Sequence, residues 1–100
     1  QFKMPPFGFI NSIIISSSSK IHAEAYSRKI IKEDLVPKGI EIFGPVEAPL
    51  FLLRGKYRFR ILIKGDNRQK LNKFTSNLVK KTPEPSNVRL IIDVDPYNFV

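Results

Sequence analysis

The nine residues KYRFRILIK, from Lys56 to Lys64, decide the fold that we expect for this chain. Successive side chains of a β-strand point to opposite faces of a sheet, so alternation of two residue types predicts a strand with two different faces. One face would be aromatic and aliphatic and the other basic, with Leu62 as the exception: Tyr57, Phe59, Ile61 and Ile63 against Lys56, Arg58, Arg60 and Lys64. Such a strand belongs in a sheet that covers a core on one side only.

The sequence on either side of this strand predicts two amphipathic helices and three further strands. Short apolar runs favour strands, and apolar residues at helical spacing after Ser, Asp or Asn favour capped helices. In chain order we expect a strand at 8–16, a helix at 20–34 capped within the serine tract 16–19, a strand at 40–43, a long connection at 45–55, the strand at 56–64, a helix from Asp66-Asn67 to Lys81, a loop at 82–87 and a strand at 88–94.

The order β-α-β-β-α-β predicts an α+β fold of the split-βαβ, ferredoxin-like kind. Right-handed crossovers place both helices on one face of a four-stranded sheet and leave the other face open. We expect a single domain over residues 1–100, with 1–7 as an extended entry segment because of its two prolines. The strand at 56–64 should lie beside the first and last strands, with Arg58 and Arg60 exposed on the open face. The expected buried side chains are Tyr57, Phe59, Ile61, Leu71, Phe74 and Leu78.

The positive charge of the chain is concentrated in one stretch. The net charge is +8, and residues 54–81 contain ten Lys or Arg against one acid, Asp66. Such an excess is typical of a polyanion site, the alternative being a solvated surface that keeps the protein soluble. Because the basic side chains alternate with the aromatic ones, we expect contacts with phosphates and little reading of base sequence. The residues expected to make these contacts with nucleic acid are Arg58, Arg60, Lys64, Lys70 and Lys73.

Arg68 differs from the other cations because it falls in the first turn of the predicted second helix. A cation is unfavourable there with respect to the helix dipole. Together with the helix's N–H groups it would make a pocket for a carboxylate or a phosphate. The alternative is an arginine that contacts solvent alone.

The sequence offers little for catalysis or for metal binding. Cys is absent and His22 is the single histidine, which argues against disulfides and against a zinc site. Asp93 and Asp95 are two apart and could share a cation, although acids at a strand end more often balance nearby arginines. There is no phosphate-binding glycine loop, and the longest apolar runs are too short to span a membrane. We therefore expect no catalytic residue, metal or cofactor in this chain, no membrane segment, and a soluble, intracellular protein.

Several motifs in order resemble the C-terminal domain of the primosomal protein N′ family, the PriA replication-restart helicases. Residues 44–50, GPVEAPL, are similar to the family's G-P-x-x-A-P-L, and residues 54–58, RGKYR, to R-G-R/K-Y/F-R. A basic helix follows, and residues 93–96 read DVDP, as the family does near its end. Residues 4–7, MPPF, are similar to Y-P-P-F with Met in place of Tyr, and Phe59-Arg60 stands where Trp-Gln is common.

The resemblance implies that the chain is a piece of an ATP-dependent 3′→5′ DNA helicase that recognises stalled forks and reloads the replisome. The absence of an initiator Met before Gln1 fits such a piece. ATP, Mg²⁺ and zinc sites would lie in upstream helicase domains, and the partners would be forked and single-stranded DNA, primosome proteins and those upstream domains, in the bacterial cytoplasm.

The resemblance further implies a fold like that of ribosomal protein S10, with a share in the pocket for the acidic C-terminal tail of single-stranded-DNA-binding protein. The family's Arg and Gln, one helical turn apart in the second helix, correspond to Arg68 and to Asn72, a shorter amide. The alternative to this reading is an S10-like module that binds RNA or the ribosome.

Overall fold

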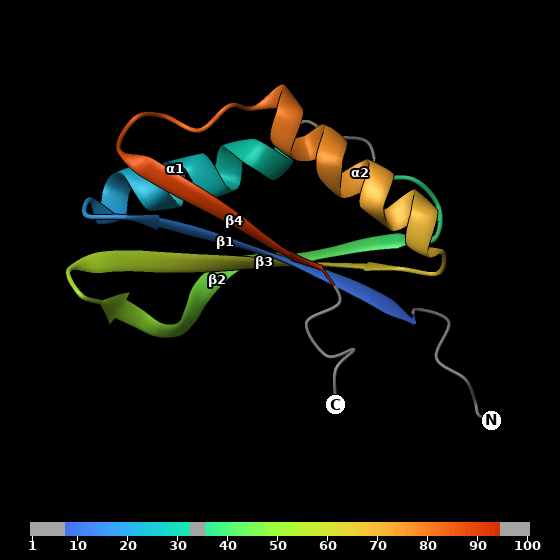
Figure 1. Ribbon diagram of the computed structural model, residues 1–100, viewed down its shortest axis with the longest axis horizontal. Coiled ribbons are helices and arrows are strands. Elements are labelled where there is room, and N and C mark those ends of the chain that lie inside the picture. Colours follow the sequence, from blue (N-terminus) through green and yellow to red (C-terminus); the bar gives the residue numbers. More distant parts are fainter. Residues whose placement is uncertain (1–7, 33–35, 95–100) are drawn as a thin grey trace.

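The computed structural model describes residues 8–32 and 36–94, which form four strands and two helices (Figure 1). The expected entry segment 1–7 and Asp95 lie outside the described residues. The elements in chain order are β1 (Phe9–Ser17), α1 (Lys20–Ile31), β2 (Ile40–Leu53), β3 (Lys56–Gly65), α2 (Arg68–Lys81) and β4 (Val88–Val94).

The strands form one antiparallel sheet in the order β2-β3-β1-β4, and both helices lie on the same side of it (Figure 1). The expected α+β fold is confirmed. The expectation that residues 56–64 pair with the last strand is wrong, because β3 pairs with β1 and β2 while β4 pairs with β1. The connection from β1 through α1 to β2 leaves a gap one strand wide between these two strands. The chain then turns back from β2 in a hairpin, and β3 fills that gap. The crossover through α2 then carries the chain past β1 to its far side.

Strand β2 is longer than expected, because residues 45–53 belong to it and are not a connection. It is an edge strand, where proline is tolerated because its missing N–H need not face a neighbour. Its register against β3 shifts between Phe43 and Val46 and again between Glu47 and Leu52. The Gly44–Pro45 peptide bond is cis, and Gly44 has a φ of +109°. A Cβ on Gly44 would lie 2.7 Å from the carbonyl oxygen of Arg60, so the close approach of β2 to β3 requires glycine.

A two-residue turn, Arg54-Gly55, joins β2 to β3, because Leu53 and Lys56 are already paired. Both turn residues have positive φ, at 54° and 77°. This is the backbone of a type I′ turn, whose twist matches that of a hairpin. Arginine is uncommon at the first position of such a turn, so residue preferences did not indicate a hairpin here.

The core lies between the helices and the sheet. Ile13 and Ile15 of β1 and Ile61 and Ile63 of β3 are completely buried at its centre. The helices contribute a buried stripe each, at Ala23, Tyr26 and Ile30 of α1 and at Leu71, Thr75 and Leu78 of α2. Neither helix of the described part has the length and apolar composition that a membrane span needs.

Most of the expected burial is confirmed, with two corrections at the margins. Phe59, Ile61, Leu71 and Leu78 are buried as expected. Tyr57 is half-buried because it pairs with Ser17, the last residue of β1, where the sheet ends. Phe74 is also half-buried, since Thr75 takes the inward position on α2 and Phe74 packs at the edge of the core.

Both helices begin where their capping residues predict. The Ser19 hydroxyl accepts a hydrogen bond from the backbone N–H of His22 at 3.3 Å, and Asn67 Oδ1 accepts one from the N–H of Lys70 at 2.8 Å. Each cap satisfies one of the N–H groups that the first helical turn leaves without an intrahelical partner. The serine tract and the Asp66-Asn67 pair therefore act as predicted.

Tyr26 joins the two helices and makes the stability of the fold depend on pH. Its hydroxyl donates to the carbonyl oxygen of Thr82 at 2.5 Å. Burial, assisted by the negative charge of Glu84, raises the pKa of Tyr26 from 10.0 to about 12. Because the folded pKa exceeds the unfolded one, the stabilisation that the neutral phenol adds is complete below pH 10 and is lost as the pH rises towards 12.

We expect Tyr26→Phe to lower the free energy of unfolding by about 1 kcal/mol at pH 7, the typical contribution of one hydrogen bond. The variant should also lose less stability than the wild type between pH 10 and pH 12, because it lacks the titrating phenol. Urea unfolding followed by circular dichroism at several pH values measures both effects. Parallel pH profiles for the two proteins would contradict this role.

Candidate nucleic-acid interface

The strand register aligns the residues of the open face into rows across the sheet. Paired residues of antiparallel strands share a face. Ser16 of β1 pairs with both Arg58 of β3 and Arg89 of β4, so these three side chains form one row, which we call the basic row. The next row consists of Ile91, Ile14, Arg60 and Val46, and the row after it of Asp93, Ser12, Leu62 and Phe43. The open face is therefore basic at one end and largely apolar in the middle.

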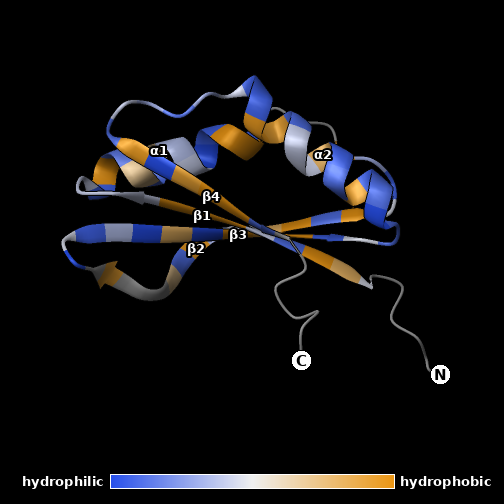
Figure 2. Cartoon of the chain, viewed as in Figure 1, coloured by the Kyte–Doolittle hydropathy of each residue, from blue (hydrophilic) through white to orange (hydrophobic). Residues whose placement is uncertain are grey.

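Arg58, Arg60 and Lys64 lie on this open face, as the alternation along β3 predicts. Hydrophilic and hydrophobic residues alternate along the ribbon of β3 (Figure 2). The expected exposure of Arg58 and Arg60 needs correction, because both are half-buried. Their side chains stand in the middle of a sheet, between neighbours on the flanking strands. The Nε of Arg60 is buried, and none of the described residues accepts a hydrogen bond from it. The Arg60 guanidinium therefore leaves one donor unsatisfied in the fold.

Phe43 is a candidate site residue that the sequence reasoning missed. It lies on the open face, 45% exposed, with the ammonium nitrogen of Lys64 5.0 Å from its ring centre. It was missed because the aromatic residues of 56–64 were expected in the core, which suggested that the other aromatic side chains lie there too. The alternation in residues 40–43, IEIF, is the signal that could have found it, since Ile40 and Ile42 occupy the inward positions.

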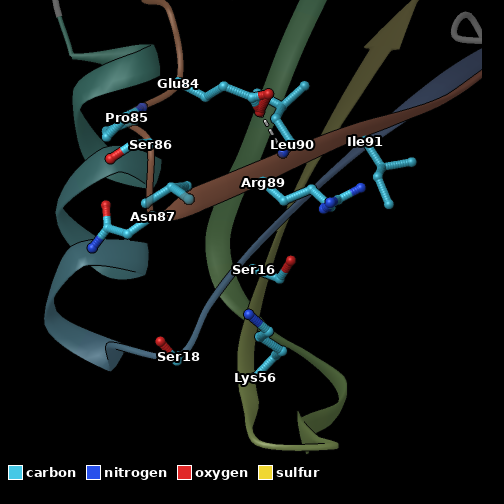
Figure 3. Close-up of a pocket in the computed structure, with 11 residues that line it drawn as sticks. Ser16, Ser18, Lys56, Glu84, Pro85, Ser86, Asn87, Arg89, Leu90 and Ile91 are labelled. Carbon is cyan, nitrogen blue, oxygen red and sulfur yellow. Dashed lines mark hydrogen bonds between the residues drawn. The ribbon is translucent and has the colours of Figure 1, made fainter.

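A hollow of about 580 Å³ adjoins the basic row (Figure 3). The ends of β1, β3 and β4 and the loop before β4 line it, and Lys56, Ser16 and Ser18 lie along its floor in this view. On its upper side Glu84 accepts a hydrogen bond from the backbone N–H of Leu90 at 2.8 Å. The hollow thus combines cations and hydroxyl donors, the groups that bind anions, with one carboxylate, Glu84, whose side chain is bonded to the backbone.

Lys70 and Lys73 are separated from these arginines. Both belong to α2, which covers the opposite face of the sheet (Figure 1). The ammonium group of Lys70 lies 3.2 Å from Asp66 and donates to the carbonyl oxygen of Lys38 at 2.8 Å. Lys73 is exposed. The five residues expected to bind DNA therefore divide between two surfaces, three on the sheet and two on the helix layer.

Arg68 and Asn72 form a pair on one side of α2, four residues apart. The guanidinium carbon of Arg68, the first residue of the helix, lies 4.7 Å from the ring centre of Phe9. Asn72 Oδ1 accepts a hydrogen bond from Asn11 Nδ2 at 3.1 Å. Both side chains thus reach from α2 to β1. Beside Asn72 is a hollow of about 420 Å³ between α2 and the strands.

Asn11 lines that second hollow and is almost fully buried. Its Nδ2 also donates to Thr75 Oγ1 at 3.0 Å, but its Oδ1 has no hydrogen-bond partner among the described residues. The Asn72 amide therefore has a structural contact in addition to any contact with a ligand.

The groups considered for acid–base or metal chemistry do not gather. His22 is exposed and contacts the side-chain amide of Asn87, and Asp93 is exposed on β4. Within residues 8–32 and 36–94, no three His, Cys, Asp or Glu side chains are placed to hold a metal ion.

Comparison with known proteins assigns this chain to a family. The family model "Primosomal protein N C-terminal domain" matches residues 1–97. A "Replication restart protein PriA" from Rickettsia conorii is 40% identical over 100 residues, which cover 96% of this chain and 15% of the relative. Proteins of the same name from Rickettsia prowazekii and Haemophilus influenzae are 36% identical over 97 residues (96% of this chain, 15% of the relative) and 37% identical over 62 residues (61% and 8%).

A solved structure, the C-terminal DNA binding domain of the latency-associated nuclear antigen of MHV-68, aligns with a TM-score of 0.45 and 13% identity, covering 90% of this chain and 73% of that chain. The chain spans about 15% of the length of the Rickettsia proteins that it matches. With a family model that covers nearly the whole sequence and relatives up to 40% identical, the resemblance noted in the motifs is confirmed: the chain belongs to the family of primosomal protein N C-terminal domains, the C-terminal domain of the replication restart protein PriA.

Proposed function

We propose that this chain is the DNA-binding and partner-binding C-terminal domain of an ATP-dependent 3′→5′ DNA helicase that restarts stalled replication forks. The observation that carries the proposal is the basic row, in which Arg58 and Arg89 flank the Ser16 hydroxyl on the sheet face that neither helix covers. Because the chain spans about 15% of its Rickettsia relatives, we assign ATP hydrolysis, Mg²⁺ and zinc to the rest of the longer protein. Its proposed partners are forked and single-stranded DNA, the upstream helicase domains and primosome proteins.

Contact with the DNA backbone explains the composition of the open face. Among the residues that the structure describes, this face carries five cations and two acids, the cations being Lys56, Arg58, Arg60, Lys64 and Arg89 and the acids Glu41 and Asp93. Cations that neutralise phosphates release bound counterions, so binding of this kind weakens steeply with salt and does not depend on sequence. A domain that must act at any stalled fork needs this kind of binding.

For DNA we expect a slope of about −3 to −4 in a plot of log affinity against log salt concentration, if roughly four phosphates are neutralised. Replacing Arg58 and Arg60 together by Ala should flatten the slope by about 1.4 on a single strand and about 1.8 on a duplex. Replacing Lys70 and Lys73 should change it less, because Lys70 already pairs with Asp66. Fluorescence anisotropy titrations of labelled DNA at several salt concentrations measure the slopes.

The double variant Lys29→Ala/Lys32→Ala is a matched control, since it removes two exposed cations at the end of α1. It should leave the slope nearly unchanged. If the control and the Arg58/Arg60 variant flatten the slope equally, net charge governs binding and the open face is not the DNA-binding surface.

For the protein partner we propose that Arg68 and Asn72 bind the acidic C-terminal tail of single-stranded-DNA-binding protein. Arg68 lies at the N-terminus of α2, where helical N–H groups also favour an anion. The Phe9 ring under its guanidinium holds the side chain beside β1. In this proposal Arg68 binds the terminal carboxylate, and the hollow beside Asn72 accepts a neighbouring side chain of the tail.

Arg68→Glu should weaken binding of a tail peptide by roughly 10- to 150-fold, the loss of one charge-assisted contact, while DNA affinity falls only modestly. Lys73→Glu is the control, because it makes the same charge change at an exposed position of the same helix. Calorimetric titration of the peptide with a free and with an amidated C-terminus measures the contact. Equal affinity of the wild type for both peptides would contradict a carboxylate site at Arg68.

A further inference from the structure

We propose that the open face of the sheet binds single-stranded nucleic acid, with a phosphate in the basic row and a base against Phe43 and its apolar neighbours. This inference rests on the proposed DNA binding and deepens it, because it assigns the single-stranded form to this face of the sheet and gives the place of the phosphate and the base. Two observations carry it, namely the composition of the basic row and the exposed apolar side chains in the next two rows.

The basic row has the groups and the spacing that a phosphodiester needs. Directly opposed residues of neighbouring antiparallel strands lie about 4.5–5.5 Å apart, so the guanidinium groups of Arg58 and Arg89 can reach a phosphate above Ser16 from both sides. The Ser16 side chain is half-buried, and within the described part of the chain no hydrogen bond occupies its hydroxyl. Lys56 lies in the adjoining hollow and adds a third cation at the same end (Figure 3).

The two rows beyond the basic row form an apolar strip that a duplex has no groups to cover. Phe43, Val46 and Ile91 are 45%, 52% and 53% exposed and all lie on this face. Leu62 and Ile14 fill the spaces between them and are half-buried. A duplex presents phosphates and sugars and keeps its bases stacked inside, whereas an unpaired base has an apolar face that stacks on an aromatic ring.

Charge gives the bound strand a preferred position. Lys64 stands opposite Glu41 in the strand register at the far end of the face and lies over Phe43, and Asp93 occupies the outer edge of the third row. These residues of the far end are one cation and two acids, whereas the basic row consists of two cations and a serine. A phosphate is most favourable in the basic row, and Lys64 is available for the phosphate next to a base on Phe43. A second copy of this chain, with its own cations facing these, would meet repulsion that a polyanion does not.

The test compares three labelled probes of equal length in anisotropy titrations at one salt concentration: a single strand of dT, the same strand without bases, and a blunt duplex. We expect the dT strand to bind at least about tenfold more tightly than the other two probes. Phe43→Ala should weaken dT binding by about 5- to 100-fold and leave the other probes nearly unaffected. Phe43→Tyr keeps the ring and should bind dT as the wild type does.

Two matched variants complete the design. Leu52→Ala removes an apolar side chain of β2 that is 55% exposed, compared with 45% for Phe43 on the open face. Leu52 is the register partner of Tyr57, which belongs to the helix side of β3, so the variant should not affect dT binding. Ser16→Ala should weaken binding of the dT strand and of the strand without bases by the same factor, because the Ser16 hydroxyl would bind a phosphate. Ser76→Ala removes a hydroxyl from α2 and should change the binding of neither probe.

The outcomes separate this inference from the proposed function. If the duplex binds as tightly as dT, or if Phe43→Ala weakens all probes equally, the single-strand inference is wrong, while a flattened salt slope in the Arg58/Arg60 variant would still support binding to the DNA backbone. If no probe binds, both fail. A dimer in sedimentation that Phe43→Ala dissociates would assign the apolar strip to self-association and overturn the inference.

Discussion

The alternation of side chains along β3 is the constraint on which the rest of the structure depends. β3 is hydrogen-bonded on both sides, and the helices cover one of its faces. Phe59, Ile61 and Ile63 point into the core, so Arg58 and Arg60 must point to the open face. A register shift of one residue would bury cations beneath the helices, at a cost comparable to the whole stability of a domain this size. The core and the basic face therefore follow from one register.

The same register separates the two proposed binding surfaces. Odd-numbered residues of β1 face the helices, and Phe9 and Asn11 contact Arg68 and Asn72 there. Even-numbered residues face the open side, where Ser16 joins Arg58 and Arg89. In the proposed function, nucleic acid and the acidic tail occupy different layers of the domain and so need not compete for the same cations.

The sequence predicts best where one local pattern determines the structure. The alternation in residues 56–64, the Asn67 cap of α2 and the strand from Val88 to Val94 are found as predicted, and the buried stripe of α2 keeps Leu71 and Leu78 but has Thr75 in place of Phe74. The strand at 40–43 was predicted, but its continuation through residues 45–53 was missed, because proline and glycine indicate a break and their tolerance depends on the strand being at an edge. Likewise, the contacts of Lys70 with Asp66 and Lys38 depend on how α2 meets the start of β2. The exposure of Phe43 depends on which face of the sheet the helices cover. These features are set by tertiary packing.

The central claim of the proposed function is that nucleic acid binds on the sheet face opposite the helices, and not on the helix layer. Chemical-shift mapping by NMR during titration with a short single strand tests it most directly, since each backbone N–H group reports on its own surroundings. The account predicts that the largest shifts occur in β1, β3 and β4 around Ser16, Arg58 and Arg89, with the Phe43 ring also shifted, while α1 and α2 change little. Shifts concentrated on the helices, with the open face unaffected, would contradict it.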